Sequence, residues 1–286
     1  MFFTILAFMG SLPSELAAQK KWDGEGADGL WQNAVNWADN QLPEAGDKIM
    51  FDNSLVAGDY QVSLGGGTSV INAFSVAILP GIGRNIRVLI PGSNSAAPAL
   101  TCTGERYGLM IGSGGELLNS SGAAAGATLD IADSIRIDNG GKYIHATPRS
   151  HADIVRILSR AAGTETGEFE FRIPVASSTI SVSGQVFGKL RLSPGPGGTI
   201  NYTGTGTNDL TVRSDLEIAA GVNLSFNLEG RLSLGRDLKH DGGLLNLGST
   251  ARKLQFEVGG NLKVATAATI TETGSATPEI ILAGQV

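Results

Sequence analysis

The chain has 286 residues, of which 40 are glycine, and only 17% of its residues are charged and 6% are aromatic. Its formal net charge of −6 and its pI near 5.1 exclude the broad basic surface that binds nucleic acid. Because the glycines separate alternating apolar residues, the composition favours ordered β-structure over a flexible linker.

Residues 1–18 have the features of an export signal. Phe2 to Leu12 is an apolar run too short to span a bilayer, and Ala17 and Ala18 supply small residues before a cleavage point ahead of Gln19. The segment is atypical because it has no lysine or arginine at its start. No other stretch approaches 18 consecutive apolar residues, so we expect export and no membrane span in the mature chain.

Residues 19–53 hold all three tryptophans of the chain, Trp22, Trp31 and Trp37, among Asp-Gly and Asn turn residues. The first coil of a solenoid has an open end, and bulky rings cover its apolar core and strand edges, so we predict an N-terminal cap. An alternative is that the same three tryptophans form a sugar-stacking platform. A third alternative is a cation site built from the aspartates of this segment, Asp23, Asp28, Asp47 and Asp52. Their spacing matches no calcium-binding loop, and we predict no metal site.

Residues 60–143 contain short runs of alternating apolar residues bounded by Gly, Pro, Asn or Ser, which predicts strands with one buried face. The runs at 129–131 and 135–137 are six residues apart, the same offset as the runs at 210–212 and 216–218. We therefore interpret this region as an eroded version of the C-terminal coils.

Residues 151–160 break the strand pattern. Ile154, Ile157 and Leu158 recur with the spacing of one helix face, and Ser150 is placed to cap the first turn. The pattern predicts a short helix inserted between coils and packed on the flank of the solenoid.

From residue 208 onward the chain repeats itself. Apolar triplets begin 22 residues apart at Leu210, Leu232 and Leu254. A second leucine follows each triplet, at Leu216, Leu238 and Leu262, the last delayed by two residues. A period near 20 residues, built from short strands and turns, is typical of stacked β-coils. We predict an all-β, right-handed parallel β-solenoid of ~20–22-residue coils over residues 54–286, truncated at its C-terminal end, with the handedness taken from the general rule for parallel crossovers.

Few side chains suggest chemistry. The chain has one cysteine and three histidines, Cys102, His145, His151 and His240. The cysteine lies in an apolar run and is expected to be buried, and the histidine spacings match no metal motif. Asp215 and Asp237 lie one coil apart, as a carboxylate pair for glycoside chemistry would, but each occupies a corner where turn formation favours aspartate. We predict no catalytic residue and no cofactor.

Several motifs carry a resemblance to a known group of proteins. Between Trp22 and Asn53 they are Trp-Asp-Gly, Gly-x-Trp, Asn-Trp, Pro-x-x-Gly-Asp and Phe-Asp-Asn, and others follow at 143–145, 150–154, 167–171, 187–190 and 208–212. Together they resemble the N-terminal β-repeat region of large secreted or surface proteins of Bacteroidetes, many of which are type IX secretion cargo with a C-terminal sorting domain. The resemblance implies export and a repetitive β-scaffold, and it implies no catalytic residue. This sequence departs from it in containing no sorting domain.

These patterns lead us to expect a secreted or cell-surface structural or adhesive scaffold, the N-terminal part of a larger exported protein, with no catalysis of its own. The alternative is a carbohydrate-active module that binds glycans, or cleaves them as a polysaccharide lyase or glycoside hydrolase on the solenoid flank. Surface glycans or other cell-surface proteins are the expected partners, and nucleic acid is not. In the alternative, Trp22, Trp31 and Trp37 are the candidate binding residues.

Overall fold

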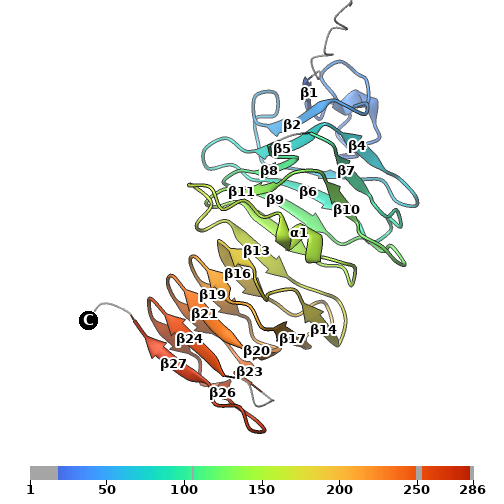
Figure 1. Cartoon of the computed structure of the whole chain (residues 1–286). Helices are drawn as coiled ribbons and strands as arrows, with labels where there is room; N and C mark the ends of the chain where they lie inside the picture. The colour runs from blue at the N-terminus through green and yellow to red at the C-terminus, as the bar shows by residue number, and fades with distance from the viewer. Residues whose placement is uncertain (1–18, 105, 249–252, 284–286) are drawn as a thin grey trace, which may run out of the picture.

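A computed structural model describes residues 19–104, 106–248 and 253–283 of the chain. The predicted export signal at 1–18 and the last residues, 284–286, lie outside the described residues. The described chain forms a right-handed parallel β-solenoid, as the repeats predicted, and every pairing between its named strands is parallel. The coils stack from the blue N-terminal end to the red C-terminal end of an elongated body (Figure 1).

One sheet of nine strands spans both halves of the described body, and we call it the long sheet. Its strands, in spatial order, are β3 (Tyr60–Ser63), β6 (Ile86–Ile90), β9 (Gly115–Asn119), β12 (Lys142–His145), β13 (Glu168–Phe171), β16 (Lys189–Leu192), β19 (Leu216–Ile218), β22 (Leu238–His240) and β25 (Leu262–Val264). From β3 onward each coil contributes one strand to it, and the first coil adds the isolated bridge between Leu30 and Ser63, so the long sheet joins the coils into one stack.

Two further faces complete each coil, and both change sheets midway along the body. In the N-terminal half one face is β1 (Gln19–Lys21), β2 (Lys48–Asp52), β5 (Ser75–Leu79), β8 (Leu109–Ile111) and β11 (Ile135–Ile137), and the other is β4 (Ile71–Ala73), β7 (Leu100–Cys102) and β10 (Leu129–Ile131). In the C-terminal half one face is β14 (Ser177–Ile180), β17 (Ile200–Gly206), β20 (Val222–Leu228), β23 (Gly243–Asn246) and β26 (Ala268–Thr271), and the other is β15 (Val186–Phe187), β18 (Leu210–Val212), β21 (Gly230–Leu234), β24 (Leu254–Val258) and β27 (Glu279–Leu282).

The faces change at the short helix α1, Ala152–Arg156. We call the segment from Ser150 to Leu158 the joint. Ser150 still pairs with Ala127 of the preceding coil, and Leu158 already pairs with Ile135. The helix therefore occupies the place of one strand, between β10 of one sheet and β14 of the next.

The predicted helix is confirmed in kind but is shorter than expected. Its N-cap is His151, whose side chain makes no capping hydrogen bond, and not Ser150. Because Ser150 and Leu158 are both held in β-bridges, the chain has room for little more than one helical turn between them. Ile154 and Val155 are the buried residues of the helix, and Leu158 belongs to the next face.

The strand register corrects one detail of the predicted repeat. Leu210 pairs with Leu232, but Leu232 then pairs with Phe256, and Leu254 lies opposite Gly230. The two extra residues therefore enter before Leu254 and not after it. Since strand side chains alternate with a period of two, a shift by two keeps both Leu254 and Phe256 in the core, and both are buried.

Coil length varies more than the ~20–22 residues expected from the C-terminal repeat. Ile86 pairs with Gly115, 29 residues further along, whereas Glu168 pairs with Lys189, 21 residues further along. The longer coils of the N-terminal half absorb their extra residues in the corners between strands, where loop closure costs little.

The interpretation of the early coils as eroded copies is wrong in its alignment. The runs at 129–131 and 135–137 are β10 and β11, which belong to the two faces that end at the joint. The runs at 210–212 and 216–218 are β18 and β19, and β19 belongs to the long sheet. The same six-residue spacing therefore connects different pairs of faces in the two halves: the two shorter faces in the N-terminal half, and one shorter face and the long sheet in the C-terminal half.

Inward side chains stack in rows through the body. One row of the long sheet consists of the buried residues Val62, Val88, Leu117, Tyr143, Phe169, Leu190, Leu216 and Leu238. The row is aromatic near the joint, where the rings of Tyr143 and Phe169 lie 5.0 Å apart and those of Phe169 and Phe171 lie 4.9 Å apart. Burying each large apolar side chain contributes about 1.5–3 kcal/mol, and only stacking provides that burial.

Candidate functional site

The three tryptophans pack together in the first coil of the stack. Trp22 and Trp37 form an antiparallel bridge, and their rings meet edge to face at 5.2 Å. The Trp37 indole N–H donates to the carbonyl oxygen of Trp31 at 2.9 Å, and all three rings surround Phe51 of β2. Each tryptophan is at most 5% exposed, so none presents a free ring face on which a sugar could stack.

The aspartates of the same segment take part in local hydrogen bonds. The Asp28 carboxylate accepts from the Leu30 N–H and from the side-chain amides of Asn33 and Asn36. These hydrogen bonds lower the pKa of Asp28 below its ordinary value. Asp52 pairs with Lys21 at 3.2 Å and accepts from the Ser54 N–H at 2.9 Å, so this carboxylate holds the end of β2.

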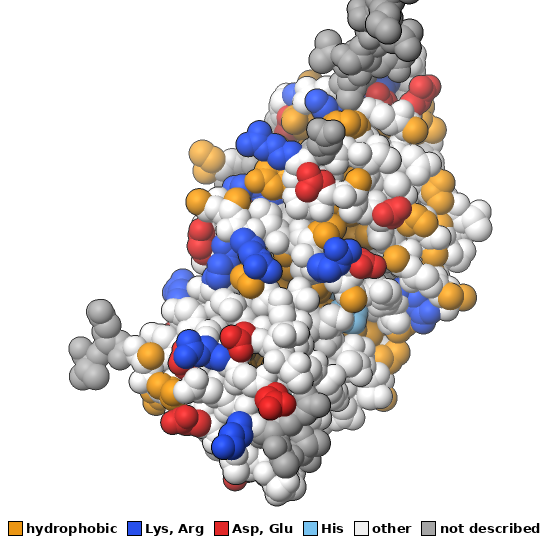
Figure 2. Space-filling model, viewed as in Figure 1, with side chains coloured by type: hydrophobic (Ala, Val, Ile, Leu, Met, Phe, Trp, Pro, Cys, Tyr) orange, Lys and Arg blue, Asp and Glu red, His pale blue; other side chains and the backbone are white. Residues whose placement is uncertain are grey.

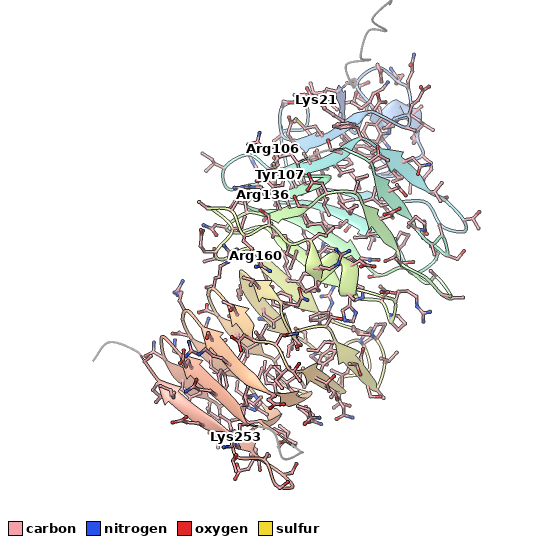
Figure 3. All side chains as sticks on the ribbon, viewed as in Figure 1. Lys21, Arg106, Tyr107, Arg136, Arg160 and Lys253 are labelled. Atoms are coloured by element: carbon pink, nitrogen blue, oxygen red, sulfur yellow. The ribbon has the colours of Figure 1, made fainter. Side chains whose placement is uncertain are left out.

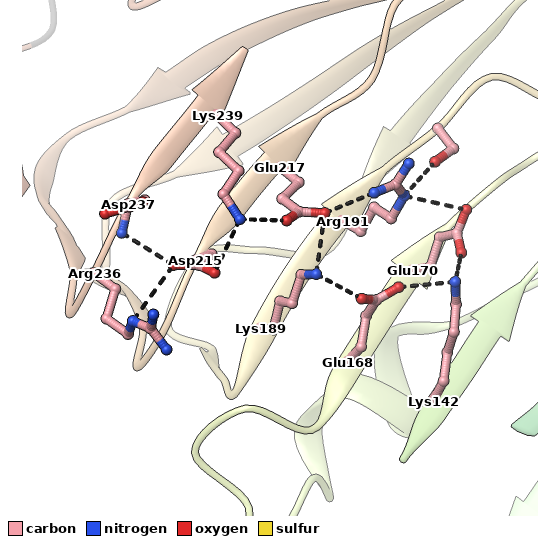
Figure 4. A network of polar contacts seen from close by, with 11 residues as sticks. Lys142, Glu168, Glu170, Lys189, Arg191, Asp215, Glu217, Arg236, Asp237 and Lys239 are labelled. Carbon is pink, nitrogen blue, oxygen red and sulfur yellow. Dashed lines mark hydrogen bonds and ion pairs between the residues drawn. The ribbon is translucent and has the colours of Figure 1, made fainter. Parts of the chain in front are cut away.

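Charged side chains form a ladder on the outer surface of the long sheet (Figure 4). The charge ladder consists of Lys142, Glu168, Glu170, Lys189, Arg191, Asp215, Glu217 and Lys239. In-register parallel strands place equivalent residues of successive coils about 4.8 Å apart, so identical charges would repel. Opposite charges meet where Lys142 faces Glu168 and Glu168 faces Lys189. At the C-terminal end of the sheet Lys239 faces Lys263, which pairs with Asp237.

Charged side chains within the ladder form ion pairs with more than one partner. Lys142 Nζ lies 2.9 Å from Glu168 and 2.6 Å from Glu170. The Glu217 carboxylate lies 2.6 Å from Arg191 Nη1, 3.0 Å from Lys189 Nζ and 2.9 Å from Lys239 Nζ. The ladder is therefore a connected network and not a set of isolated surface pairs.

Asp215 of the charge ladder and the adjacent Asp237 are the two carboxylates that the sequence offered as a catalytic pair. Asp215 lies 3.3 Å from Lys239 Nζ and accepts a hydrogen bond from the Asp237 N–H. A hydrogen bond from Lys263 and another from the Asn261 N–H hold the pKa of Asp237 well below its ordinary value. Burial opposes ionisation of Glu217, but hydrogen bonds from Lys239 and Lys189 still lower its pKa to about 2. A general acid needs a raised pKa, so this arrangement suits ion pairing and not proton donation.

A pair of buried histidines lies at the joint. The rings of His145 and His151 are 5.1 Å apart, and His151 packs edge to face on Phe171 at 4.9 Å. The Ser181 N–H donates to His151 Nε2 at 3.0 Å, just after β14, so this side chain takes up a main-chain donor where the neighbouring strand is missing. Burial, and next the charge of His151, lower the pKa of His145 to about 3. Both rings are therefore neutral structural groups near pH 7.

Lysine and arginine side chains gather along one flank of the face shown in Figure 2. Four residues of this flank, labelled in Figure 3, form what we call the arginine cluster: Arg106, Tyr107, Arg136 and Arg160. Arg136 Nε lies 2.6 Å from Asp138, and its guanidinium lies 5.4 Å from the centre of the Tyr107 ring. Arg106 and Arg160 are exposed, and neither forms an ion pair with another described residue.

The backbone of Arg106 is held in an unusual conformation. Its φ angle of 76° lies in the left-handed region, which side chains other than glycine seldom adopt. The Arg106 N–H donates to the Asp133 carboxylate, and the Ser134 hydroxyl donates to the Arg106 carbonyl oxygen. Two side chains of the next coil thus fix the position of this arginine. The sequence gives no sign of this cluster, because only the coil register brings residues 106 and 136 together.

The remaining candidate groups are structural. Cys102 is buried in β7, as predicted, and burial raises the pKa of its thiol to about 12. In the described part of the chain, no three metal-binding side chains are grouped to hold an ion. No helix among the described residues is long and apolar enough to cross a membrane.

Comparison of the chain with protein-family models, with curated proteins and with solved structures found no match.

Proposed function

We propose that the protein is a structural scaffold, a stiff β-solenoid that holds other surfaces at a distance, and that it has no catalysis of its own. The observation that carries this proposal is the long sheet, whose nine strands run through both halves. Its outer charges alternate in sign between successive coils from Lys142 to Lys189 and from Glu170 to Lys239. Parallel strands joined in register by hydrogen bonds resist bending, and paired charges remove the repulsion that would separate the coils.

The proposal includes export to the cell surface or medium, as the N-terminal part of a larger exported protein. Two features of the sequence support it: the apolar segment at 1–18 and the motifs that resemble Bacteroidetes surface proteins. A spacer in that setting needs length and stiffness, and both follow from stacking coils without any further chemistry.

Solution scattering and protease treatment of intact cells test the scaffold proposal. We expect a scattering profile of an elongated particle and cleavage of the chain on cells without lysis. A compact, near-spherical particle, or protection of the chain until the cells are lysed, would contradict it. A variant with an unpaired ladder charge, Glu217→Arg, serves as the control: it should lower the melting temperature without shortening the particle.

A second candidate function is binding of acidic glycans, and the arginine cluster favours it. The guanidinium groups of Arg106 and Arg136 lie over the Tyr107 ring, and those of Arg106 and Arg160 are exposed and form no ion pair with another described residue. Side chains of the next coil hold the main chain of Arg106. Guanidinium groups bind carboxylate and sulfate groups through paired N–H donors. We place glycan recognition here and not at the buried tryptophans.

Retention on immobilised polygalacturonate, with neutral dextran as the comparison matrix, tests this candidate. The double variant Arg106→Ser, Arg160→Ser should elute at clearly lower salt than the unmodified chain. Arg231→Ser, which removes an arginine already paired with Glu257 at 3.4 Å, is the matched control. Equal elution of the two variants, or equal retention on dextran, would exclude glycan binding at the cluster.

A further inference from the structure

The face that contains α1 is missing one strand. β10 is the last strand of its sheet and pairs only with β7, while β14 begins the next sheet on the same side of the body. From β4 to β26 each of the other coils supplies one strand to this face. At the joint the chain forms α1 after Ser150 instead of a strand. Figure 1 shows the helix beside β10 at this break. A strand edge inside the body is thus left without a neighbouring strand.

The hydrogen-bond pattern shows which groups of β10 face the break. The Leu100 N–H donates to the Thr128 carbonyl, and the Ala132 N–H donates to the Cys102 carbonyl. Residues 128 and 132 therefore direct their main-chain groups toward β7. Because the direction alternates along a strand, the N–H and C=O groups of Leu129 and Ile131 point the other way, toward the break.

These main-chain groups have no protein partner on that side among the described residues. A groove of about 390 Å³ lies there, lined by Leu129, Asp130 and Ile131 on the strand side and by Ile154, Arg156 and Ile157 on the helix side. Arg156 is paired with Asp153, another lining residue, at 3.0 Å. Backbone groups in such a position bind water or a ligand, because an unpaired buried N–H or C=O costs about 1–3 kcal/mol.

We propose that this groove binds an extended polypeptide segment of a partner protein, which adds to β10 as a parallel strand. Only an extended polypeptide carries alternating N–H and C=O groups at the spacing of those on Leu129 and Ile131. Three residues of strand span about 10 Å, which matches the length of β10, Leu129–Ile131. The apolar side chains of Ile154 and Ile157 line the groove, so small or apolar residues of the segment fit against them.

Charge defines the central residue of the segment. Asp130 is exposed on the outer surface of β10 and takes part in no ion pair with another described residue. In the long sheet this protein places lysine opposite glutamate in successive coils, as in Lys142 and Glu168. A strand added next to β10 places one outward residue opposite Asp130. We expect lysine or arginine in the bound segment opposite Asp130, with a small residue on each side. Opposite charges would then face each other there as they do in the long sheet.

Titration of the isotope-labelled full chain with the capped peptide Thr-Ala-Lys-Ala-Thr, followed by amide NMR, tests the proposal. Saturable shifts should concentrate at the amides of Leu129 and Ile131 and on α1. In the parallel register, the N–H groups of the peptide lysine and of the last threonine donate to the carbonyl groups of Leu129 and Ile131. Methylation of those two nitrogens should weaken binding at least tenfold.

A matched peptide with methyl groups on the two alanine nitrogens, which face away from β10, is the control and should lose less than threefold. Equal losses for the two methylated peptides, or shifts that lie elsewhere on the body, would overturn the proposal. Saturation of the same amides by oligogalacturonate and not by the peptide would also overturn it, since the groove would then be a glycan site.

The charge of the groove is tested on the protein side. Asp130→Lys should weaken the lysine peptide about two- to fivefold, the size of an exposed ion pair, and should strengthen a peptide with glutamate in its place. Asn72→Lys, exposed on the same outer row two coils away from Asp130, is the control. An equal effect of Asn72→Lys would show general electrostatics and would remove the case for a defined register.

Discussion

The two halves of the long sheet solve the same stacking problem in different ways. One outer row runs through Ser63, Leu89, Leu118 and Ile144 in the N-terminal half and continues as Glu170, Arg191, Glu217 and Lys239 beyond the joint. Apolar residues stack on one another without penalty, whereas charged residues must alternate in sign. A continuous sheet therefore tolerates a change of surface chemistry along its length. The alternation of charge ends at Lys239, which faces Lys263, and Lys263 pairs with Asp237 instead.

The other faces behave differently, because they do not continue through the joint. There the interior changes to aromatic rings, with Tyr143, Phe169, Phe171 and Phe187 in contact across the break. Large rings fill the irregular space left when one strand is replaced by a single helical turn. We therefore expect the stability of the joint to depend on the packing of its rings and the stability of the C-terminal half to depend on charge pairing. The outer row of the N-terminal half should depend on neither.

The largest effect should come from removing a ring at the joint. Phe171→Ala should lower the free energy of unfolding by about 3–5 kcal/mol, because Phe171 is fully buried among His151, Phe169 and Tyr202. Phe256→Ala, at a buried position in the C-terminal half, is the matched control and should cost about 1 kcal/mol less, since it lacks the ring contacts. Urea unfolding of both variants measures the difference, and a larger loss for Phe256→Ala would contradict the distinction.

The next effect is acid sensitivity at the joint. The pKa of His145 is lowered to about 3 in the folded chain, while the unfolded chain binds this proton near pH 6.5. Stability is therefore complete above pH 6.5 and falls as the pH drops toward 3, by about 2 kcal/mol at pH 5 from this group. The variant His145→Gln should flatten the profile of unfolding free energy between pH 7 and pH 5.

Phe256→Ala, which removes a buried side chain that does not titrate, is the control. It should lower the free energy of unfolding at both pH values and keep the original acid slope. If His145→Gln had the same slope as the unmodified chain, His145 would not be the group responsible.

Charge pairing should give a smaller loss. Glu217→Gln leaves Lys189, Arg191 and Lys239 without their shared carboxylate and should cost about 1–2 kcal/mol at pH 7. Since the pKa of Glu217 is lowered to about 2, its contribution is present above about pH 4.3 and disappears as the pH falls to 2. Glu257→Gln removes a single exposed pair with Arg231 and should cost no more than about 0.5 kcal/mol.

The smallest effect concerns the outer row of the N-terminal half. It tests whether opposite charges placed in register there stabilise the sheet as they do in the C-terminal half. Leu89 and Leu118 are opposite each other in β6 and β9, and both are half-buried. The double variant Leu89→Lys, Leu118→Glu should be about 0.5 kcal/mol more stable than the sum of the two single variants, because opposite charges then face each other. A double-mutant cycle measures this coupling, and a value of zero would show that register in this row has no electrostatic component.

Most of the fold was predictable because a solenoid is a local pattern repeated. Alternation with a period of two marked the strands, and a repeat near 22 residues marked the coils from Leu210 onward. The break at residues 151–160 was also visible, since Ile154 and Ile157 follow a helical period and not a strand period.

The candidate sites were less predictable, because they depend on the register between coils. Glu168 and Lys189 are 21 residues apart, and Arg106 and Arg136 are 30 apart, and neither spacing has a sequence signature in coils of unequal length. When the length of one corner between strands is not known, the pairing of all residues in the following coils is not known either. The tryptophans illustrate the same point: their clustering was plain in the sequence, but only the packing of Trp22, Trp31 and Trp37 around Phe51 shows that their faces are covered.

The sequence by itself determined that this chain forms strands with one inward face, that the strands recur as coils, and that a helical turn interrupts them once. Those properties depend on neighbours within a few residues. Tertiary structure alone decided which charges meet, which face loses a strand, and where the edge of β10 is left unpaired. The physical reason is that side chains in a stack contact residues a full coil away, and the length of each corner, which local preferences do not fix, sets that distance along the chain.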